Sequence, residues 1–161
     1  MIIEYSKNSP ATRTPTRANA SDAGLDVYAD LKEWVKLEPG ENHMIPTGLR
    51  FGIPHGYMLQ VCNRSSMGVK RSLVVGAHIV DSGYDGEVFI DLHNIGRDSQ
   101  IINPGDKIAQ VIMVPVVPFR IKEVHSSSLY SHDISFSQRG SGALGSTDKK
   151  HPLGNVPVGG F

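Results

Sequence analysis

Closely spaced turn signals are the feature that most limits what this chain can fold into. Turns rich in proline and glycine recur at 37–42, 53–56, 82–86 and 103–107. Two of them contain Pro-Gly, and this pair favours a type II turn because proline presets φ and glycine accepts φ > 0. The runs between the turns, such as 87–94, have the length and alternation of strands, and no helical pattern is long. We expect an all-β sandwich, jelly roll or barrel, with one short helix or turn around 66–72.

The charge balance limits what the chain can bind over a broad surface. Its 161 residues, enough for one domain, carry 16 Lys and Arg against 16 Asp and Glu. Without a net positive field, we expect no binding to a nucleic-acid polymer or to an anionic membrane. A small anionic ligand, held by a few well-placed groups, is compatible with this composition.

The cysteine content and the N-terminal sequence indicate a reducing, intracellular compartment. Cys62 is the one cysteine, so no intrachain disulfide can form, and residues 1–10 lack the basic and then apolar pattern of a signal peptide. The apolar run 108–119 is too short and too often interrupted by proline to span a bilayer. We expect a cytoplasmic protein, with a nuclear or organellar address left open.

A change of composition near His125 predicts a core of residues 1–124 followed by an arm of residues 125–161. Ser and Gly supply 11 of the 24 residues from 125 to 148, which leaves little apolar area to offset the entropy of ordering. We therefore expect a flexible arm. Within it, residues 139–150 combine Arg with glycines and hydroxyls, a mixture that favours a phosphate clasp. Taken alone, the same mixture is more typical of a linker.

Five stretches carry side chains suited to chemistry more than to packing. In chain order they are ASDAGLDVYA (20–29), NRSSMGVK (63–70), GAHIVDSGYDGEV (76–88), GDKIAQVI (105–112) and RGSGALGSTD (139–148). Their order and separations resemble the five motifs of the homotrimeric dUTPase family, from about residue 20 to 148. The resemblance implies a jelly-roll-like, distorted β-barrel protomer in a homotrimer, with three active sites at subunit boundaries. Each site would convert dUTP and water to dUMP and pyrophosphate with Mg²⁺.

The third stretch resembles the β-hairpin that receives uracil in this family. By that resemblance Asp81 activates the water and Tyr84 packs on the deoxyribose, and the substrate-binding residues also include Gly76, Ala77, His78 and Ile79. A carboxylate in a partly closed pocket can deprotonate a bound water, and a ring against the sugar leaves little room for a 2′-hydroxyl. Without the family resemblance, Asp81 is also compatible with an aspartate that caps a turn. Tyr84 is likewise compatible with a tyrosine packed in the core.

The second, fourth and first stretches supply the groups for the triphosphate. By resemblance Arg64 faces triphosphate oxygens, and Ser65 and the backbone N–H of Ser66 bind near the α–β bridge, where charge develops on the leaving group. Gln110 holds phosphate or a metal-bound water, and as a polar residue in an apolar run it needs a partner if buried. Asp26 orients a water on Mg²⁺, an ion that keeps several waters and needs few carboxylates. Taken alone, the stretch around Arg64 is more typical of an ordinary surface loop.

The fifth stretch resembles the family's closing arm. By resemblance Arg139, Ser146 and Thr147 grip the β- and γ-phosphates, and Leu144 with Gly145 lies over the nucleotide. Closure of such an arm excludes all water but the nucleophile and completes the site.

Leu144 stands where the family commonly has an aromatic residue that stacks on the base. Leucine offers apolar contact without a stacking face, so we expect a weaker lid and a higher KM than an aromatic residue gives. Leu144→Phe should therefore lower KM for dUTP in steady-state hydrolysis. A KM that is unchanged or higher would contradict this interpretation.

Four other positions depart from the family pattern. His78 replaces an expected glycine, and its imidazole could crowd the pocket, bond a base edge or point to solvent. Asn63 replaces a usual proline. Asp91 and His93 share a strand face with Phe89 where relatives are more often apolar. That face is either a polar, pH-sensitive centre of a trimer or an ordinary solvated strand face.

Two other functions stay open at this stage. Related dCTP deaminases share the β scaffold and triphosphate pocket, and a nucleotidohydrolase that prefers dCTP would differ mainly at the hairpin. A non-catalytic β-module that binds nucleotide is the other alternative, because a fold alone does not establish activity. Asp81 with Tyr84 and the stretch 139–148 fit the hydrolase pattern better.

Overall fold

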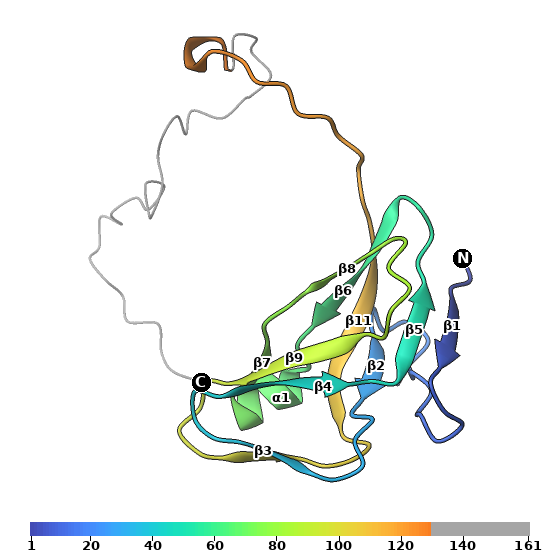
Figure 1. Cartoon of the computed structure of the whole chain (residues 1–161), viewed down its shortest axis with the longest axis vertical. Coiled ribbons are helices and arrows are strands. Elements are labelled where there is room, and N and C mark those ends of the chain that lie inside the picture. Colours follow the sequence, from blue (N-terminus) through green and yellow to red (C-terminus); the bar gives the residue numbers. More distant parts are fainter. Residues whose placement is uncertain (130–161) are drawn as a thin grey trace, which may run out of the picture. The chain divides into compact units, whose positions relative to one another are not determined.

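The computed structural model describes residues 1–129 and confirms the all-β prediction (Figure 1). The strands are β1 (Glu4–Lys7), β2 (Leu25–Tyr28), β3 (Val35–Leu37), β4 (Asn42–Pro46), β5 (Leu49–Gly52), β6 (Tyr57–Cys62), β7 (Leu73–Val75), β8 (Ile79–Asp81), β9 (Phe89–Asn94), β10 (Gln100–Ile102) and β11 (Lys107–Pro115). The helices are α1 (Ser65–Arg71) and the single 3₁₀ turn η1 (Ser126–Ser128). None of the helices in this part of the chain is long and apolar enough to cross a membrane.

The chain divides into two units, Met1–Phe119 and Arg120–Phe161. The first holds all the strands of the described residues, and the second is described only for 120–129, which includes η1. The predicted arm residues Arg139, Leu144, Gly145, Ser146 and Thr147 lie outside the described residues.

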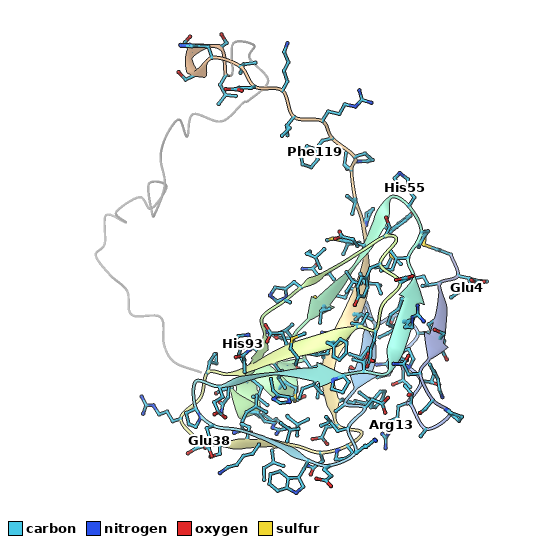
Figure 2. All side chains as sticks on the ribbon, in the orientation of Figure 1. Glu4, Arg13, Glu38, His55, His93 and Phe119 are labelled. Carbon is cyan, nitrogen blue, oxygen red and sulfur yellow. The ribbon has the colours of Figure 1, made fainter. Side chains whose placement is uncertain are left out.

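Two antiparallel sheets enclose the core of the first unit. One has the strand order β2-β11-β6-β8 and the other β4-β9-β7, with the pairs β1-β5 and β3-β10 beside them. Side chains alternate along each strand, so alternate residues of both sheets face a common interior. Fully buried residues include Val27, Leu59 and Val111 from the first sheet and Ile90 and Leu92 from the second. Figure 2 shows the side chains that fill the space between the strands.

The local predictions at turns and at the helix are confirmed. Gly40 and Gly105 have φ of 83° and 79°, the conformation that a Pro-Gly turn requires of its glycine. The short helix expected around 66–72 is α1. It ends at Ser72, whose left-handed φ of 52° makes it a C-cap, and Lys70 and Arg71 in its last turn face the negative end of the helix dipole.

Strand β11 contains one extra residue near its start. Lys107 pairs with Tyr28 but Ala109 pairs with Val27, so Ile108 has no counterpart on β2. Ile108 and Ala109 are consecutive and both fully buried, which regular alternation does not allow. Because of this bulge, Lys107 and Gln110 point to the same face of the sheet although they are three residues apart.

The second sheet has a polar cluster on its outer face. As predicted, Phe89, Asp91 and His93 alternate on that face with buried neighbours. Asp91 accepts a hydrogen bond from Asn42 Nδ2 at 3.0 Å, and its other oxygen lies 2.8 Å from His93 Nε2. The bond from Asn42, and then that from His93, lowers the pKa of Asp91. His93 is labelled in Figure 2.

Candidate active site

Four of the predicted site residues meet in one pocket. Asp26 comes from β2, Gln110 from the neighbouring β11, and Arg64 and Ser65 from the start of α1. The pocket has a volume of about 210 Å³, and its other lining residues are Ala18, Asp22 and Gly24. Residues from three separate sequence stretches are therefore brought together by the register of the sheet.

Asp26 is the centre of an ion cluster in this pocket. Arg64 Nε donates to one carboxylate oxygen at 2.8 Å, and Lys107 Nζ lies 2.8 Å from the other. Burial raises the pKa of Asp26, but the hydrogen bonds from Lys107 and Arg64 outweigh it and leave the pKa below its usual value. The bond to Asp26 in turn raises the pKa of Lys107. At neutral pH the cluster therefore holds one anion and two cations.

Arg64 also organises the start of α1. Its Nη1 donates to Ser66 Oγ at 3.1 Å and approaches the carbonyl oxygen of Lys107 at 3.4 Å. Arg64 is the N-cap of α1 but its side chain makes no capping bond. The N–H of Met67 bonds to the carbonyl oxygen of Arg64 at 3.0 Å, whereas the N–H groups of Ser65 and Ser66 have no backbone acceptor among the described residues. They suit an anionic ligand beside Ser65.

Gln110 is half-buried, and its side-chain amide has a hydrogen-bond partner. Its Nε2 donates to the carbonyl oxygen of Asn63 at 2.9 Å. A Cβ at Gly24 would lie 2.4 Å from Gln110 Oε1, so a larger residue there would displace the amide from its present place. Asn63 itself is more than a loop detail, because its Oδ1 accepts the N–H of Val75 at 2.7 Å. Proline in place of Asn63 would lack that acceptor.

A second pocket forms at the turn between β8 and β9. By resemblance a β-hairpin was expected here, but β8 pairs with β6 and β9 pairs with β4 and β7, so this turn joins two different sheets. We keep the name hairpin for residues 79–89. Its volume is about 210 Å³, and it is lined by Met44, Ile79, Val80, Asp81, Tyr84, Glu87, Val88 and Phe89. Three predicted residues, Ile79, Asp81 and Tyr84, are thus brought together in one hollow. A carboxylate and a half-exposed ring beside apolar side chains can receive a flat base with its sugar.

Tyr84 is held in place by its own hairpin. Its hydroxyl donates to the carbonyl oxygen of Glu87 at 2.8 Å, and a Cβ at Gly86 would lie 2.5 Å from that hydroxyl. The side chain of Glu87 accepts from Gly48 N at 2.8 Å and from Asn8 Nδ2 at 2.7 Å. The hairpin is therefore tied to the turn between β4 and β5 and to the N-terminal segment.

Three predicted substrate-binding residues do not line this pocket. Gly76, Ala77 and His78 are exposed and lie just before β8. A Cβ at Gly76 would lie 2.3 Å from Asp91 Oδ2 and from His93 Nε2, so a larger residue there would displace the polar cluster. His78 Nδ1 lies 2.9 Å from the carbonyl oxygen of Val61, which ties the ring to β6.

The two pockets lie far apart within one chain. They have no lining residue in common. Asp81 pairs with Met58 and Gln110 with Cys62, at opposite ends of β6. Asp81 and Gln110 are separated by four residues along β6 and by two strand spacings across the sheet. Together these two offsets give a distance of roughly 16 Å. A general base, its water and the phosphorus must lie in successive contact, so one chain does not bring these two residues onto the same phosphate.

The described residues fit a metal bound mainly by its substrate. Between residues 1 and 129 there is no group of three or more His, Cys, Asp or Glu side chains that could hold an ion. Both oxygens of Asp26 are already paired with cations. This donor set fits Mg²⁺ that carries its own waters and phosphate ligands, with Asp26 in contact through water.

Sequence reasoning missed three residues that shape the two pockets. They are Lys107, which pairs with Asp26; Asn63, which supports Gln110; and Glu87, which fixes Tyr84. The only sequence signal for Lys107 is the break in alternation at Ile108 and Ala109. The other two depend on contacts to distant segments, which no local pattern records.

Comparison with known proteins gives one consistent family. The sequence model of dUTPase matches residues 11–147. The deoxyuridine 5'-triphosphate nucleotidohydrolase of Azoarcus sp. (strain BH72) is 38% identical over 141 residues, which covers 86% of this chain and 90% of the relative. That of Chlamydia muridarum is 32% identical over 145 residues, or 89% of this chain and 96% of the relative.

Solved structures give the same result. A mutant dUTPase of Staphylococcus bacteriophage 80alpha with dUpNHpp superposes with a TM-score of 0.78 at 27% identity, and covers 91% of this chain and 98% of that one. The dUTPase from phage phi11 of S. aureus gives a TM-score of 0.71 at 28% identity, over 77% of this chain and 96% of that one. The jelly-roll-like fold class is confirmed. The chain belongs to the dUTPase family.

Proposed function

We propose that this protein hydrolyses dUTP to dUMP and pyrophosphate, which limits uracil in DNA and supplies dUMP for thymidylate synthesis. The observation that carries the proposal is the meeting of Asp26, Arg64, Ser65 and Gln110 in one pocket of the sheet. A guanidinium, an amide and the N–H groups of Ser65 and Ser66 beside one carboxylate are suited to a triphosphate. The hairpin pocket, with Asp81 and Tyr84, is suited to a deoxynucleoside.

The reaction assigns Asp81 the role of general base. The Asp81 carboxylate accepts a proton from a bound water, whose oxygen forms a bond to the α-phosphorus. The bond from that phosphorus to the α–β bridging oxygen breaks, and pyrophosphate leaves with the electron pair. Arg64 and the N–H of Ser66 stabilise the charge that develops on the leaving group. Tyr84 packs on the sugar and disfavours a 2′-hydroxyl by its bulk.

Mg²⁺ is the proposed cofactor. When bound, it would neutralise phosphate charge, and Asp26 would orient one of its waters. A solved structure of the phage phi11 dUTPase describes the coordination of a structural Mg(II) ion. That relative therefore binds Mg²⁺ at a structural site. A magnesium requirement of this protein belongs to the proposal.

A homotrimer with shared sites is the proposed assembly. The separation of roughly 16 Å between Asp81 and Gln110 supports it, because two copies can place one hairpin pocket against another copy's triphosphate pocket. The arm residues Arg139, Leu144, Gly145, Ser146 and Thr147 are proposed to close over the nucleotide. A cytoplasmic location also belongs to the proposal.

The function is tested by pyrophosphate release with dUTP, dCTP, dTTP and UTP, in Mg²⁺ and again in excess chelator. We expect rapid release from dUTP that depends on the metal and slow release from the other three. Release mainly from dCTP would keep the reaction and change its specificity. No release from any substrate would refute the proposed enzymatic activity. A non-catalytic module that binds nucleotide would then be the remaining function.

A further inference from the structure

We propose that Lys107 is a positioning residue for the triphosphate pocket: it holds the Asp26 carboxylate so that Arg64 can turn from Asp26 to the nucleotide. The inference rests on the proposed function, since it concerns the same pocket. Lys107 has no role in the assignments made above, and it does not line the pocket. Its action is therefore indirect, through Asp26.

The β-bulge places Lys107 where it can do this. In a regular strand, residues three apart point to opposite faces, and Lys107 would face away from Gln110. With Ile108 as the extra residue, Lys107 pairs with Tyr28 and turns to the face that carries Asp26 and Gln110. Its ammonium then lies 2.8 Å from Asp26 Oδ2. Bulges beside active sites commonly re-aim one side chain in this way.

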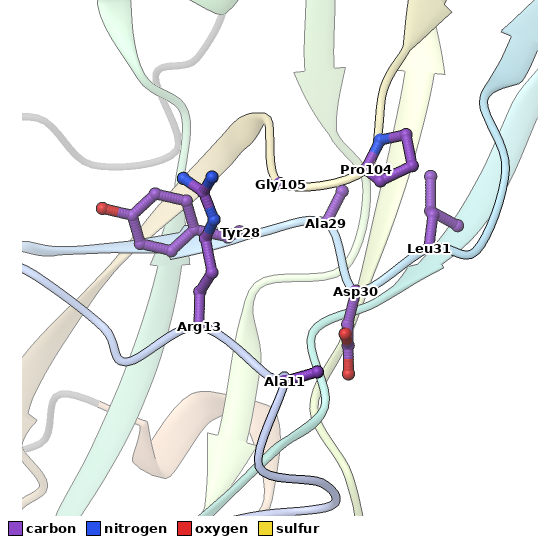
Figure 3. Close-up of a pocket in the computed structure, with 8 residues that line it drawn as sticks. All are labelled: Ala11, Arg13, Tyr28, Ala29, Asp30, Leu31, Pro104 and Gly105. Carbon is purple, nitrogen blue, oxygen red and sulfur yellow. The ribbon is translucent and has the colours of Figure 1, made fainter.

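Tyr28 supports the lysine from a second direction. The ammonium of Lys107 lies 5.8 Å from the centre of the Tyr28 ring, and the guanidinium of Arg13 lies 5.2 Å from the same centre. The Tyr28 hydroxyl is bonded to Thr16 Oγ1 at 2.5 Å. Figure 3 shows Arg13 against the Tyr28 ring at the edge of a hollow of about 240 Å³. A ring whose hydroxyl is hydrogen-bonded has a fixed orientation, and its face attracts a nearby cation.

The charges explain why a second cation is needed. The Asp26 side chain is only 14% exposed, and Arg64 Nε occupies its Oδ1. If Arg64 were the sole partner, its move to a phosphate would leave a largely buried carboxylate unpaired beside a polyanion, which is costly. Lys107 on the other oxygen keeps Asp26 paired during that move. The same contact prevents the carboxylate from following Arg64 toward the phosphates.

Nucleotide binding without metal tests this directly. The probe is dUpNHpp in excess chelator, and the variants are Lys107→Met, Lys107→Arg and each of them combined with Asp26→Asn. We expect Lys107→Met to weaken binding about tenfold, a typical effect for a charged hydrogen bond, and Lys107→Arg to stay within about threefold of wild type. In the Asp26→Asn background, Lys107→Met should have little effect because there is no carboxylate to hold. Lys36→Met is the matched control, since Lys36 also pairs with a carboxylate, that of Glu38, outside both pockets.

Steady-state kinetics and unfolding complete the test. Lys107→Met should raise KM and leave kcat within a few fold, whereas general misfolding would lower the amount of active enzyme and leave KM unchanged. Without nucleotide, the melting temperatures of the Asp26 and Lys107 single and double variants should be non-additive by about 2 to 4 °C, as expected of directly coupled residues.

The outcomes separate this inference from the proposed function. If wild type binds dUpNHpp but Lys107→Met weakens binding equally in both backgrounds, Lys107 acts on the phosphates themselves and the positioning role is wrong. If Lys107→Arg behaves like Lys107→Met, the charge is not what matters and the role is again wrong. If wild type neither binds dUpNHpp nor hydrolyses dUTP, the proposed function fails and the positioning role fails with it, although melting still reports the ion pair.

Discussion

Asp81→Asn is expected to lower kcat for dUTP by about 10³-fold, the usual contribution of a positioned general base. Asparagine keeps the size and shape of the side chain but cannot take a proton from water. The hairpin pocket should therefore still accept the base and sugar, so the Kd for dUpNHpp should stay within a few fold of wild type. Single-turnover hydrolysis and equilibrium binding together check both parts.

Asp85→Asn is the matched control for this prediction. Asp85 lies in the same hairpin but does not line the pocket, and its contact with Arg50 is made through its backbone carbonyl oxygen. The same chemical change there should leave kcat nearly unaltered. If Asp81→Asn turned over dUTP at the wild-type rate, the catalytic role of Asp81 would be refuted. The resemblance of this hairpin to the catalytic hairpin of the dUTPase family would then not extend to function.

Gly86→Ala should lower kcat/KM for dUTP by about 100-fold, because a displacement of about 1 Å at a positioning group can cost that much. The added Cβ would lie 2.5 Å from the Tyr84 hydroxyl and 2.6 Å from its Cζ, so the ring must leave its present place. The displaced Tyr84 hydroxyl would lose its hydrogen bond to the Glu87 carbonyl oxygen. The ring would then no longer stand where it excludes the 2′-hydroxyl of a ribonucleotide. The ratio of kcat/KM for dUTP to that for UTP should fall, and competition between the two substrates measures it.

Gly52→Ala supplies the control for added bulk. Neither Gly86 nor Gly52 has a positive φ, so neither change strains the backbone. At Gly52 a Cβ would meet the carbonyl oxygen of Glu4 at 3.6 Å, an ordinary contact. We expect nearly wild-type kinetics from this variant. An unchanged dUTP-to-UTP ratio in Gly86→Ala would show that the position of Tyr84 does not select the sugar.

The sequence was a good guide to local structure. Turn positions such as Gly40 and Gly105 follow from the φ that each turn requires, and the alternation of Phe89, Asp91 and His93 follows from strand periodicity. These features depend on neighbours in the chain, so local rules suffice. The grouping of Asp26 with Gln110 was reached only through family resemblance, because it depends on which strands pair.

Contacts between residues that are distant in sequence could not be predicted from local sequence patterns. Gly76 was assigned to substrate binding, and the structure shows a further constraint on it, because a Cβ there would lie 2.3 Å from side-chain atoms of Asp91 and His93. For His78 the sequence left open whether the ring crowds the pocket, bonds a base edge or points to solvent, and the structure adds a contact of its Nδ1 with the carbonyl oxygen of Val61. In both cases the deciding partner is more than ten residues away, and nothing near the residue in sequence indicates it.

The distance between the two pockets of one chain has a consequence for how activity could be lost. In the proposed assembly a chain that folds perfectly but stays alone has no complete active site. Dilution below the concentration at which copies associate would then inactivate the protein without unfolding it. Substitutions on a contact face, remote from any nucleotide, would act in the same way. The residues of these contact surfaces would be needed both for association of the copies and for catalysis. A substitution that weakened association would therefore also lower activity.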